Sequence, residues 1–537
     1  MANRAILVAM NDTPRTCQQP VDGSTTTSVA PRQPLDRIPV ITLAVLTAVI
    51  HFAVNLVTPY GVHRDELLYL AMGRHLDLFR MEFPPAIAIL AELSRLIPGD
   101  SVFEIRFLPA LASAALVLFA AMIAAELGGR RFAQTSAALA VVTSPLFLRA
   151  GNLFQPVVFD QLAWTVGLYS LARLSRTGDC KWWMWYGIAT GFALLTKFSA
   201  IFFGVATLIA VVVTRERRWL LTRWPWVAFG IVIVIGSPSL IGQLRLDLPV
   251  IQQMRDLQES QLERVTPIAF LLGQIQLGPA FLLAAGGLAW LLASAAARPF
   301  RVVGWTCAFC FLILLALKGK PYYLGPVYPA LCAAGGVAIE RISRRPVRIV
   351  SRGPLVILLI AYGTLLFPIG VPILSPPLMA RYAVAIGAES ALRTNRGELD
   401  RLPQDYADML GWPEQVAAVA EVYNGLPPED RARAVIIADN YGEAGAIDYY
   451  GPRYGLPPAI SAAGTYWFFG PGSKPGEVAV TVGIDDEDLK PFFEDIEPAG
   501  RFTHPWSVSE ERDIPIHVAR RPRATLQQVW PSLKGRN

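Results

Sequence analysis

Long apolar segments recur along most of this chain, and they constrain its fold more than any other feature. A helix needs about 20 mostly apolar residues to cross a membrane. About eleven segments approach that length, and one of them is interrupted by Gly278-Pro279, where we expect a kink. They cover residues 38–57, 105–126, 132–149, 156–174, 182–196, 198–214, 225–243, 268–294, 300–317, 321–340 and 354–374. The pattern predicts an α-helical integral membrane protein.

The composition agrees with a membrane protein. Of 537 residues, 53% are hydrophobic and 17% are charged, whereas about a quarter are charged in a soluble domain. A disordered chain and a purely soluble enzyme are therefore disfavoured. The 5 cysteines are too few for a disulfide scaffold, and a net charge of +6 is too small to suggest nucleic-acid binding.

The distribution of Lys and Arg predicts the orientation, because these residues gather in cytoplasmic loops. With a cytoplasmic N-terminus, the loops on the inner side carry sixteen Lys and Arg between residues 130 and 352, against four in the short outer loops. An odd number of spans then places both the loop 58–104 and the chain after residue 375 outside. We expect a multi-pass protein of a bacterial plasma (inner) membrane.

Three regions follow from these patterns. Residues 1–37 are polar and read as a disordered cytoplasmic tail, and residues 38–374 as the transmembrane domain with its first outer loop at 58–104. From residue 375 to 537 the composition is that of a soluble domain. Its expected helices at 405–424 and after 440 alternate with expected strands at 433–439 and 477–484, which predicts an extracytoplasmic C-terminal α/β domain.

Charged residues at the outer edge of the membrane are candidates for function, because an ionisable group there is costly unless it is paired or hydrated. Structural explanations stand beside each of them: a helix start, a polar turn before prolines, an interhelical hydrogen bond, or lysines that snorkel to the surface. The orientation places all of them on one face. The candidates are the acids Asp65, Glu66, Glu82 and Asp160, the lysines Lys197 and Lys320, and the neighbouring Tyr322 and Tyr323.

Together these side chains suit transfer chemistry at the level of the lipid head groups. Lysines can hold a phosphate whose lipid tail stays in the bilayer. A nearby carboxylate can remove the proton of an attacking hydroxyl. Because Asp65 and Glu66 are neighbours on a helix, they point about 100° apart, so one can face a cavity while the other binds Arg64, His63 or a helix terminus.

Five short motifs in this order resemble the polyprenyl-phosphate-sugar-dependent glycosyltransferases of the GT-C type, over residues 38 to 345. This group includes glycosyltransferase family 39, with the protein O-mannosyltransferases and the aminoarabinose transferase of lipid A. The motifs are Asp65-Glu66, Glu82-Phe83-Pro84-Pro85, Asp160 after Pro156, Gly191-Phe-Ala-Leu-Leu-Thr196-Lys197, and Lys320-Pro-Tyr-Tyr323 with Pro326 and Pro329.

The resemblance implies roles for some of these residues. The first-loop aspartate of the family is held to be the catalytic base, which corresponds to Asp65, with Glu66 beside it. Lys197 is expected near the donor phosphate. Many relatives carry a lysine where this chain has Phe83, so no phosphate or metal role is carried over for that turn. Some relatives bind a divalent cation near the first-loop acids and others need none, so no cofactor is assigned and a cation stays open.

The resemblance implies an inverting transfer of sugar from a polyprenyl-phosphate donor to a hydroxyl or amine outside the membrane. Lys197 and Lys320 would stabilise the leaving phosphate, helped by Tyr322 or Tyr323, while Glu66, Glu82 and Asp160 would orient the acceptor. The acceptor, a lipid, a glycan or a protein, and the sugar stay open. The alternatives are a transporter or flippase of a lipid-linked sugar, and a ligase or polymerase that uses a diphosphate donor.

Overall fold

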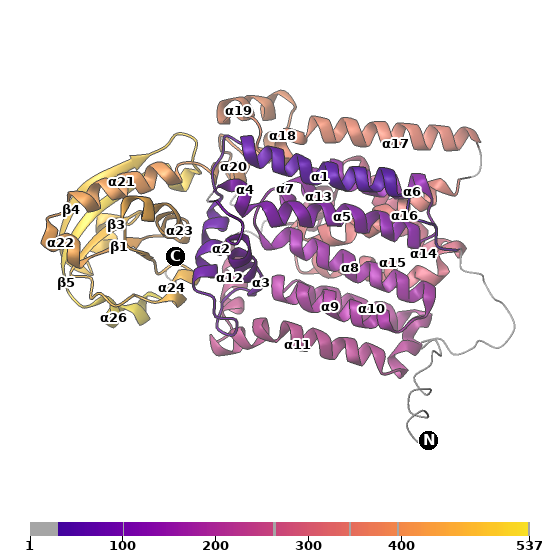
Figure 1. The fold of residues 1–537 in the computed structure, drawn as a ribbon, viewed down its shortest axis with the longest axis horizontal. Helices are drawn as coiled ribbons and strands as arrows, with labels where there is room; N and C mark the ends of the chain where they lie inside the picture. The colour runs from indigo at the N-terminus through magenta and orange to yellow at the C-terminus, as the bar shows by residue number, and fades with distance from the viewer. Residues whose placement is uncertain are drawn as a thin grey trace, which may run out of the picture.

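The computed structural model describes residues 31–99, 101–260, 262, 265–342, 345–394 and 397–534. Most of the expected cytoplasmic tail, residues 1–30, lies outside the described residues. A bundle of helices forms one end of the molecule, and a domain built around a β-sheet lies beyond the other end of the bundle, next to α2 (Figure 1). The expected fold class, a helical membrane protein with a small C-terminal α/β region, is confirmed.

A helix occupies each of the apolar segments found in the sequence. The main helices are α1 (Arg37–Val57), α5 (Phe107–Glu126), α6 (Arg131–Thr143), α8 (Pro156–Thr177), α9 (Lys181–Thr196), α10 (Ala200–Val213), α11 (Trp224–Arg245), α14 (Pro279–Ala293), α15 (Arg301–Ala316), α16 (Tyr328–Glu340) and α17 (Arg345–Leu365). Shorter helices continue some of them, including α7 (Pro145–Gly151), α13 (Pro267–Gln274) and α18 (Phe367–Gly370).

The number of spans is less plain than the number of apolar segments. Among the described residues, 5 helices are long and apolar enough to cross a membrane alone, or up to 6 if a bent pair counts as one span. That pair, Pro267–Leu277 and Pro279–Ala293, bends by 108° where Gly278 has a φ of +59°. The expected kink is thereby confirmed. The other apolar segments form shorter or broken helices, so about eleven spans remain a prediction.

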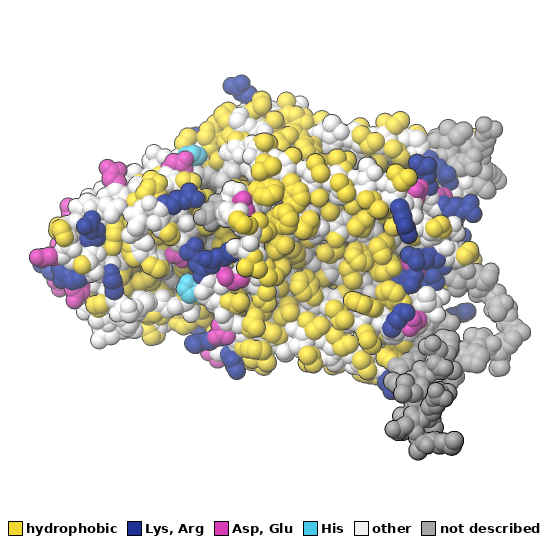
Figure 2. All heavy atoms as spheres, viewed as in Figure 1, with side chains coloured by type: hydrophobic (Ala, Val, Ile, Leu, Met, Phe, Trp, Pro, Cys, Tyr) yellow, Lys and Arg dark blue, Asp and Glu magenta, His cyan; other side chains and the backbone are white. Residues whose placement is uncertain are grey.

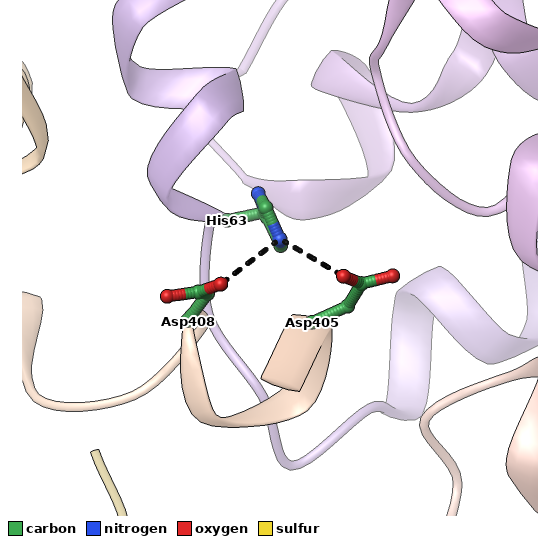
Figure 3. Close-up of side chains that lie close together, drawn as sticks. All are labelled: His63, Asp405 and Asp408. Carbon is green, nitrogen blue, oxygen red and sulfur yellow. Dashed lines mark ion pairs between the residues drawn. The ribbon is translucent and has the colours of Figure 1, made fainter. Parts of the chain in front are cut away.

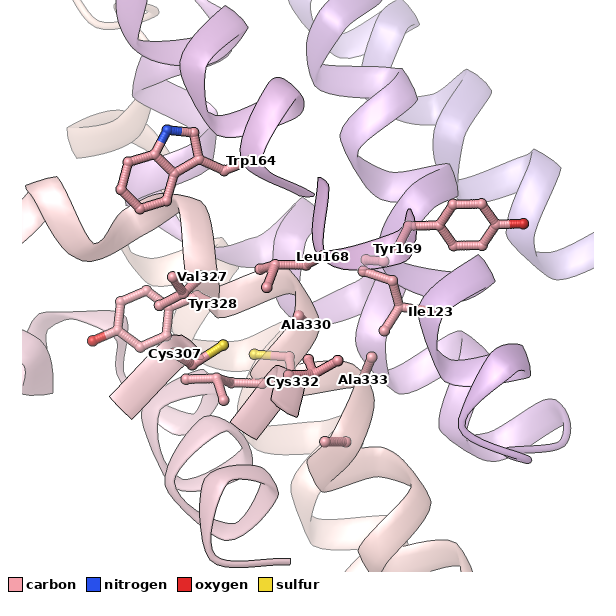
Figure 4. Close-up of a cluster of buried hydrophobic side chains, with 14 of the residues drawn as sticks. Ile123, Trp164, Leu168, Tyr169, Cys307, Val327, Tyr328, Ala330, Cys332 and Ala333 are labelled. Carbon is pink, nitrogen blue, oxygen red and sulfur yellow. The ribbon is translucent and has the colours of Figure 1, made fainter. Parts of the chain in front are cut away.

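Two glycines allow α14 and α16 to pack unusually closely inside the bundle. A Cβ on Gly335 would lie 1.9 Å from the carbonyl oxygen of Leu283, and one on Gly287 would lie 2.0 Å from that of Leu331. Small residues are typical where transmembrane helices approach each other. Figure 4 shows the neighbouring core, where Leu168, Cys332 and other buried side chains from several helices meet.

Gly335→Ala should destabilise the protein by about 1–3 kcal/mol, because the added methyl group meets backbone that cannot turn aside. Thermal unfolding in detergent measures the effect as a lower Tm. Gly286→Ala is the matched control, since a Cβ at this position on α14 meets no atom within 4 Å. Equal Tm values for the two variants would contradict this packing.

The first outer loop contains α2 (Arg64–Arg74) and α3 (Ala86–Ser94), and the segment between α11 and α13 contains α12 (Pro249–Ser260). The core around α2 is shared with the α/β domain. Leu67 and Phe154 belong to the same buried cluster as Trp412 and Ile447. This shared core fixes the α/β domain against the outer loop.

The α/β domain contains a five-stranded mixed sheet of order β2-β1-β3-β5-β4. The strands are β1 (Ala434–Ala438), β2 (Ala459–Ile460), β3 (Val478–Val482), β4 (Phe493–Thr503) and β5 (Asp513–Pro522). β1 pairs in parallel with β2 and β3, whereas β5 is antiparallel to β3 and β4. The helices α21 (Trp412–Gly425) and α23 (Tyr441–Tyr450) match the two expected ones.

Sequence analysis found β1 and β3 but missed the β4–β5 hairpin. β1 and β3 are short apolar runs buried in the sheet, which makes them recognisable. β4 is largely exposed, contains Pro498, and shifts register between Pro498 and Gly500. Such a polar edge strand lacks the alternation by which strands are detected.

Candidate active site

The acidic pair of the first outer loop lies at the start of α2, where the helical bundle meets the α/β domain. His63 caps the helix: its Nδ1 accepts the amide hydrogen of Asp65 at 3.0 Å, and the Glu66 carboxylate accepts that of His63 at 2.8 Å. This capping box holds the first turn of the helix rigidly. Asp65 and Glu66 consequently point into different surroundings.

Glu66 is fully buried and completely bonded. Its Oε1 accepts hydrogen bonds from Nε of Arg106 at 2.7 Å and from the amide of Phe154 at 2.7 Å, while its Oε2 accepts one from Arg106 at 2.8 Å. Burial alone would raise the pKa of Glu66, but the charge and hydrogen bonds of Arg106 hold it below its usual value. Glu66 thus fastens α2 to the start of α5 and to the loop before α8.

Asp65 is only half-buried, and each of its carboxylate oxygens has one side-chain donor. The hydroxyl of Tyr441 donates to Oδ1 at 3.0 Å, and Nε2 of Gln155 donates to Oδ2 at 3.0 Å. A carboxylate oxygen can accept two hydrogen bonds. Asp65 therefore keeps the capacity to accept a proton or a hydrogen bond from a substrate.

A second group of candidates lines a small hollow of about 10 Å³ between α8, the end of α9 and the segment before α16. Asp160, Lys197, Tyr322 and Tyr323 all border it, together with Gln161. This volume is room for about one water molecule, so a phosphate or sugar group would enter only if the lining side chains moved apart.

The polar groups of this hollow are short of partners. The Lys197 ammonium lies 4.4 Å from the ring centre of Tyr323 and 5.7 Å from that of Tyr322, and it attracts Asp160. Asp160 accepts a hydrogen bond from Ser199 at 3.3 Å and also interacts with the side chain of Trp164, whereas both polar atoms of the Gln161 side chain are buried without a hydrogen-bond partner among the described residues. Such groups are ready to bind a charged ligand.

Lys320 and Asp65 do not border this hollow, but the charge of Lys320 is felt on both sides. It interacts electrostatically with Lys197 on one side and with Asp405 and Asp65 on the other. Burial, followed by the like charge of Lys197, lowers the pKa of Lys320. Tyr322 likewise interacts with both Asp405 and Asp65. Lys320 and Tyr322 thus interact both with the carboxylates of Asp65 and Asp405 and with Lys197.

Glu82 takes part in a different contact. Its Oε2 accepts a hydrogen bond from the hydroxyl of Thr465 at 2.6 Å, and its backbone carbonyl accepts one from Gln243 at 2.6 Å. Burial raises the pKa of Glu82. This residue ties the turn before α3 to α11 and to the α/β domain.

His63, Asp405 and Asp408 form a cluster between α2 and the segment that precedes α21 (Figure 3). Nε2 of His63 lies 4.0 Å from Asp405 and 3.9 Å from Asp408. All three ligand atoms lie within 4.8 Å of one another, a spacing that a metal ion could occupy.

The donor set of this cluster does not fit a divalent cation. Because Nδ1 of His63 accepts the Asp65 amide hydrogen, the neutral ring carries its proton on Nε2, the atom that would have to bind the metal. Asp405 is already paired with Arg149. Burial raises the pKa of Asp408 to about 7, although His63 and Arg64 lower it in part. We therefore derive no reaction step through a metal here.

The chain is similar to known proteins in part of its sequence and in its fold. Residues 82–241 match the family model of dolichyl-phosphate-mannose-protein mannosyltransferase. The structure of ArnT from Cupriavidus metallidurans bound to undecaprenyl phosphate has a TM-score of 0.58 and 16% identity, and covers 90% of this chain and 98% of its own. The structure of the same protein in the apo state has a TM-score of 0.57 and 17% identity, and the match covers 89% of this chain and 97% of that one. No curated protein sequence matches the chain.

Family match and fold support a GT-C type glycosyltransferase. The resemblance predicted from the sequence is thereby confirmed, as are the expected enzyme class and a multi-pass membrane protein. An identity of 16% is too low to transfer the roles of individual residues from that protein to this chain.

Four residues of the site did not emerge from the sequence as candidates. Arg106 has a detectable signal, since an arginine at the start of an apolar segment requires an acidic partner. Asp405, Asp408 and Tyr441 have none, because they lie in a soluble segment whose contact with α2 is purely tertiary. In this glycosyltransferase fold, the α/β domain therefore supplies part of the candidate site.

Proposed function

We propose that this protein is an inverting glycosyltransferase that takes its sugar from a polyprenyl-phosphate donor at the outer face of the membrane. The carrying observation is that the ammonium groups of Lys197 and Lys320 lie 5.7 and 6.0 Å from the ring centre of Tyr322, while Lys320 and Tyr322 interact electrostatically with Asp65. This arrangement supports a base near a phosphate site. The family name contains a dolichyl-phosphate-linked sugar, and the ArnT structure holds undecaprenyl phosphate, which supports a lipid-phosphate donor.

The donor phosphate would lie at the hollow bordered by Lys197, Tyr322 and Tyr323. The Lys197 and Lys320 ammonium groups would stabilise the charge that the phosphate gains as it leaves. The tyrosine hydroxyls can add hydrogen bonds. Asp160 and Gln161 have unfilled acceptor or donor capacity and would contact the sugar or the acceptor.

Asp65 would act as the general base. It takes the proton of the acceptor hydroxyl or amine, whose oxygen or nitrogen forms a bond to the anomeric carbon. The bond from that carbon to the phosphate oxygen breaks, and its electron pair leaves with the polyprenyl phosphate. Attack opposite the leaving group inverts the anomeric centre. Glu66 has no free capacity for this step, so we assign it the positioning of α2.

The charge distribution supports the orientation with a cytoplasmic N-terminus and an external α/β domain. Figure 2 shows a broad apolar belt over the bundle, with a group of Lys and Arg at the end away from the α/β domain and charges of both signs at the end next to it. At the far end of α5, buried Glu126 pairs with Arg32 and Arg173. A belt bounded by cations on one side is typical of a membrane protein with that side in the cytoplasm. A bacterial inner membrane is the location we propose.

The product distinguishes this function from transport of a lipid-linked sugar. We expect mass spectrometry of the glycolipids and glycoproteins of cells with and without the protein to reveal a glycosylated species that depends on it. Its chemistry identifies the acceptor among lipid, glycan and protein. Identical inventories, with only the sidedness of a lipid-linked sugar changed, would favour a transporter instead.

Lys197→Ala should raise the donor KM by about 10- to 100-fold and lower kcat, because a charge-assisted contact with the phosphate is lost. Initial rates over a range of donor concentrations measure both constants. Lys318→Ala is the matched control, since Lys318 is an exposed lysine between α15 and α16 that does not border the hollow. A donor KM that Lys197→Ala leaves unchanged would remove this lysine from the phosphate site.

A further inference from the structure

The α/β domain reaches the candidate base through one side chain, Tyr441, in the first turn of α23. Its hydroxyl donates to Oδ1 of Asp65 at 3.0 Å, while Gln155 of the helical bundle serves the other oxygen. Burial, together with the charge of Asp65, raises the pKa of Tyr441 well above its usual value. The hydroxyl therefore keeps its proton and remains a donor.

Arg64 holds the ring of Tyr441 in place. Its guanidinium carbon lies 4.7 Å from the ring centre, and its NH1 and NH2 groups lie 3.4 Å from Glu510 and 3.8 Å from Glu511 of the α/β domain. Arginine is well suited to stacking on an aromatic ring while it pairs with carboxylates. Arg64 directly precedes Asp65, so the first turn of α2 both carries the candidate base and contacts the ring of Tyr441.

Two glycines let α23 approach α2 closely enough for this contact. A Cβ on Gly445 would lie 2.8 Å from the Cβ of Leu67 and 3.1 Å from its backbone carbonyl carbon. A Cβ on Gly442 would lie 2.7 Å from Cγ of Arg64. The glycines after Asn440 are therefore explained by helix docking and not by a ligand.

Backbone hydrogen bonds fix the same interface. The amide of Arg64 donates to the carbonyl of Asp408 at 3.0 Å, and the amide of Gly61 donates to that of Met409 at 3.1 Å. Both join the first outer loop to the segment that leads into α21. The segment before α21 is thus held against the residues that directly precede Asp65.

We propose that the α/β domain is an integral part of the active site, in which Tyr441 is a positioning residue that orients Asp65 and stabilises its charged form. This inference rests on the proposed function, in which Asp65 is the base. It gives the α/β domain a role inside the reaction in addition to any contact with the acceptor.

Tyr441→Phe should lower kcat by about 10- to 100-fold and leave the donor KM nearly unchanged, because a hydrogen bond to a charged group is lost away from the phosphate. The acid limb of the pH–rate profile should move to higher pH, because the carboxylate loses a donor that favours its ionised form. A role limited to folding would not move that limb. Assays use the full-length protein in lipid.

Several other groups face Asp65 and are unchanged in this variant, so the shift can be attributed to the missing hydroxyl. They belong to α2 and its cap, to the segment before α21, and to the segment between α15 and α16. They are His63, Arg64, Tyr69, Asp408, Lys320 and Tyr322.

Tyr466→Phe is the matched control. Tyr466 also donates from a buried hydroxyl to an aspartate, Asp448 of the same helix α23, at 2.9 Å, but that aspartate is not Asp65. Its variant should lower Tm without moving the pH–rate profile. Equal profiles and equal kcat values for Tyr441→Phe and Tyr466→Phe would overturn the inference.

Two further variants separate this inference from the proposed function. Arg64→Lys keeps the positive charge but loses the planar guanidinium that stacks on Tyr441. Its kcat should therefore fall, but less than that of Tyr441→Phe. A wild-type kcat would show that Arg64 does not hold the ring of Tyr441 in place. Transfer by Asp65→Asn at the wild-type rate would overturn the base itself. If Asp65→Asn is inactive while Tyr441→Phe resembles its control, only the inference about the α/β domain fails.

Discussion

Asp65→Asn should lower the rate of sugar transfer by about 10²- to 10⁴-fold, the range that a general base contributes. Asparagine keeps the shape of the side chain and still offers an oxygen to Gln155, but it cannot take a proton from the acceptor. Transfer of labelled sugar from a lipid-phosphate donor in membranes measures the loss, at equal amounts of protein.

Asp77→Asn is the control for this variant. Asp77 is an exposed acid of the same outer loop, and its described side-chain contact is a local one with the amide of Phe79. We expect it to transfer sugar like the wild type. A fully active Asp65→Asn protein would show that another group takes the proton.

Arg106→Met should destabilise the protein by about 3–5 kcal/mol, because it leaves the Glu66 carboxylate charged and unpaired in a site with no exposure to solvent. Thermal unfolding in detergent and the yield of folded protein measure this loss. Losing a partner of a buried ion pair costs far more than the pair itself contributes.

The double variant Glu66→Gln with Arg106→Met tests whether this loss of stability comes from the unpaired charge of Glu66. It removes both charges, while the glutamine oxygen can still accept the amide hydrogen of Phe154. We expect it to be more stable than Arg106→Met alone and to retain transfer activity. A double variant that folds but is inactive would indicate that Glu66 takes part in the reaction, which would contradict its positioning role.

Sequence patterns predicted the helices well because the apolar runs that form them are local. The break at Gly278-Pro279 was visible for the same reason: the chain itself carries the conformational constraint. β4 was missed because an exposed edge strand needs little hydrophobic pattern.

The candidate site was predictable in its residue types and much less in its contacts. Asp65 and Lys197 stand out as charges at the edge of apolar segments. The sequence reading left open which acid of the pair faces the cavity. That choice depends on Arg106 and Tyr441, which lie 40 and 376 residues from their acidic partners. Tertiary contacts over such separations leave no periodic trace in a single sequence.

The central claim is that a carboxylate takes the proton of the acceptor while ammonium groups stabilise the phosphate of a lipid-linked sugar donor. The most direct test incubates the purified protein in lipid with polyprenyl-monophosphate-linked and polyprenyl-diphosphate-linked sugars and a membrane extract as acceptor. We predict that free polyprenyl monophosphate appears in equal amount to newly bonded sugar, with the anomeric configuration inverted. Consumption of the diphosphate donor alone, or carrier that changes sides with its sugar intact, would contradict the account.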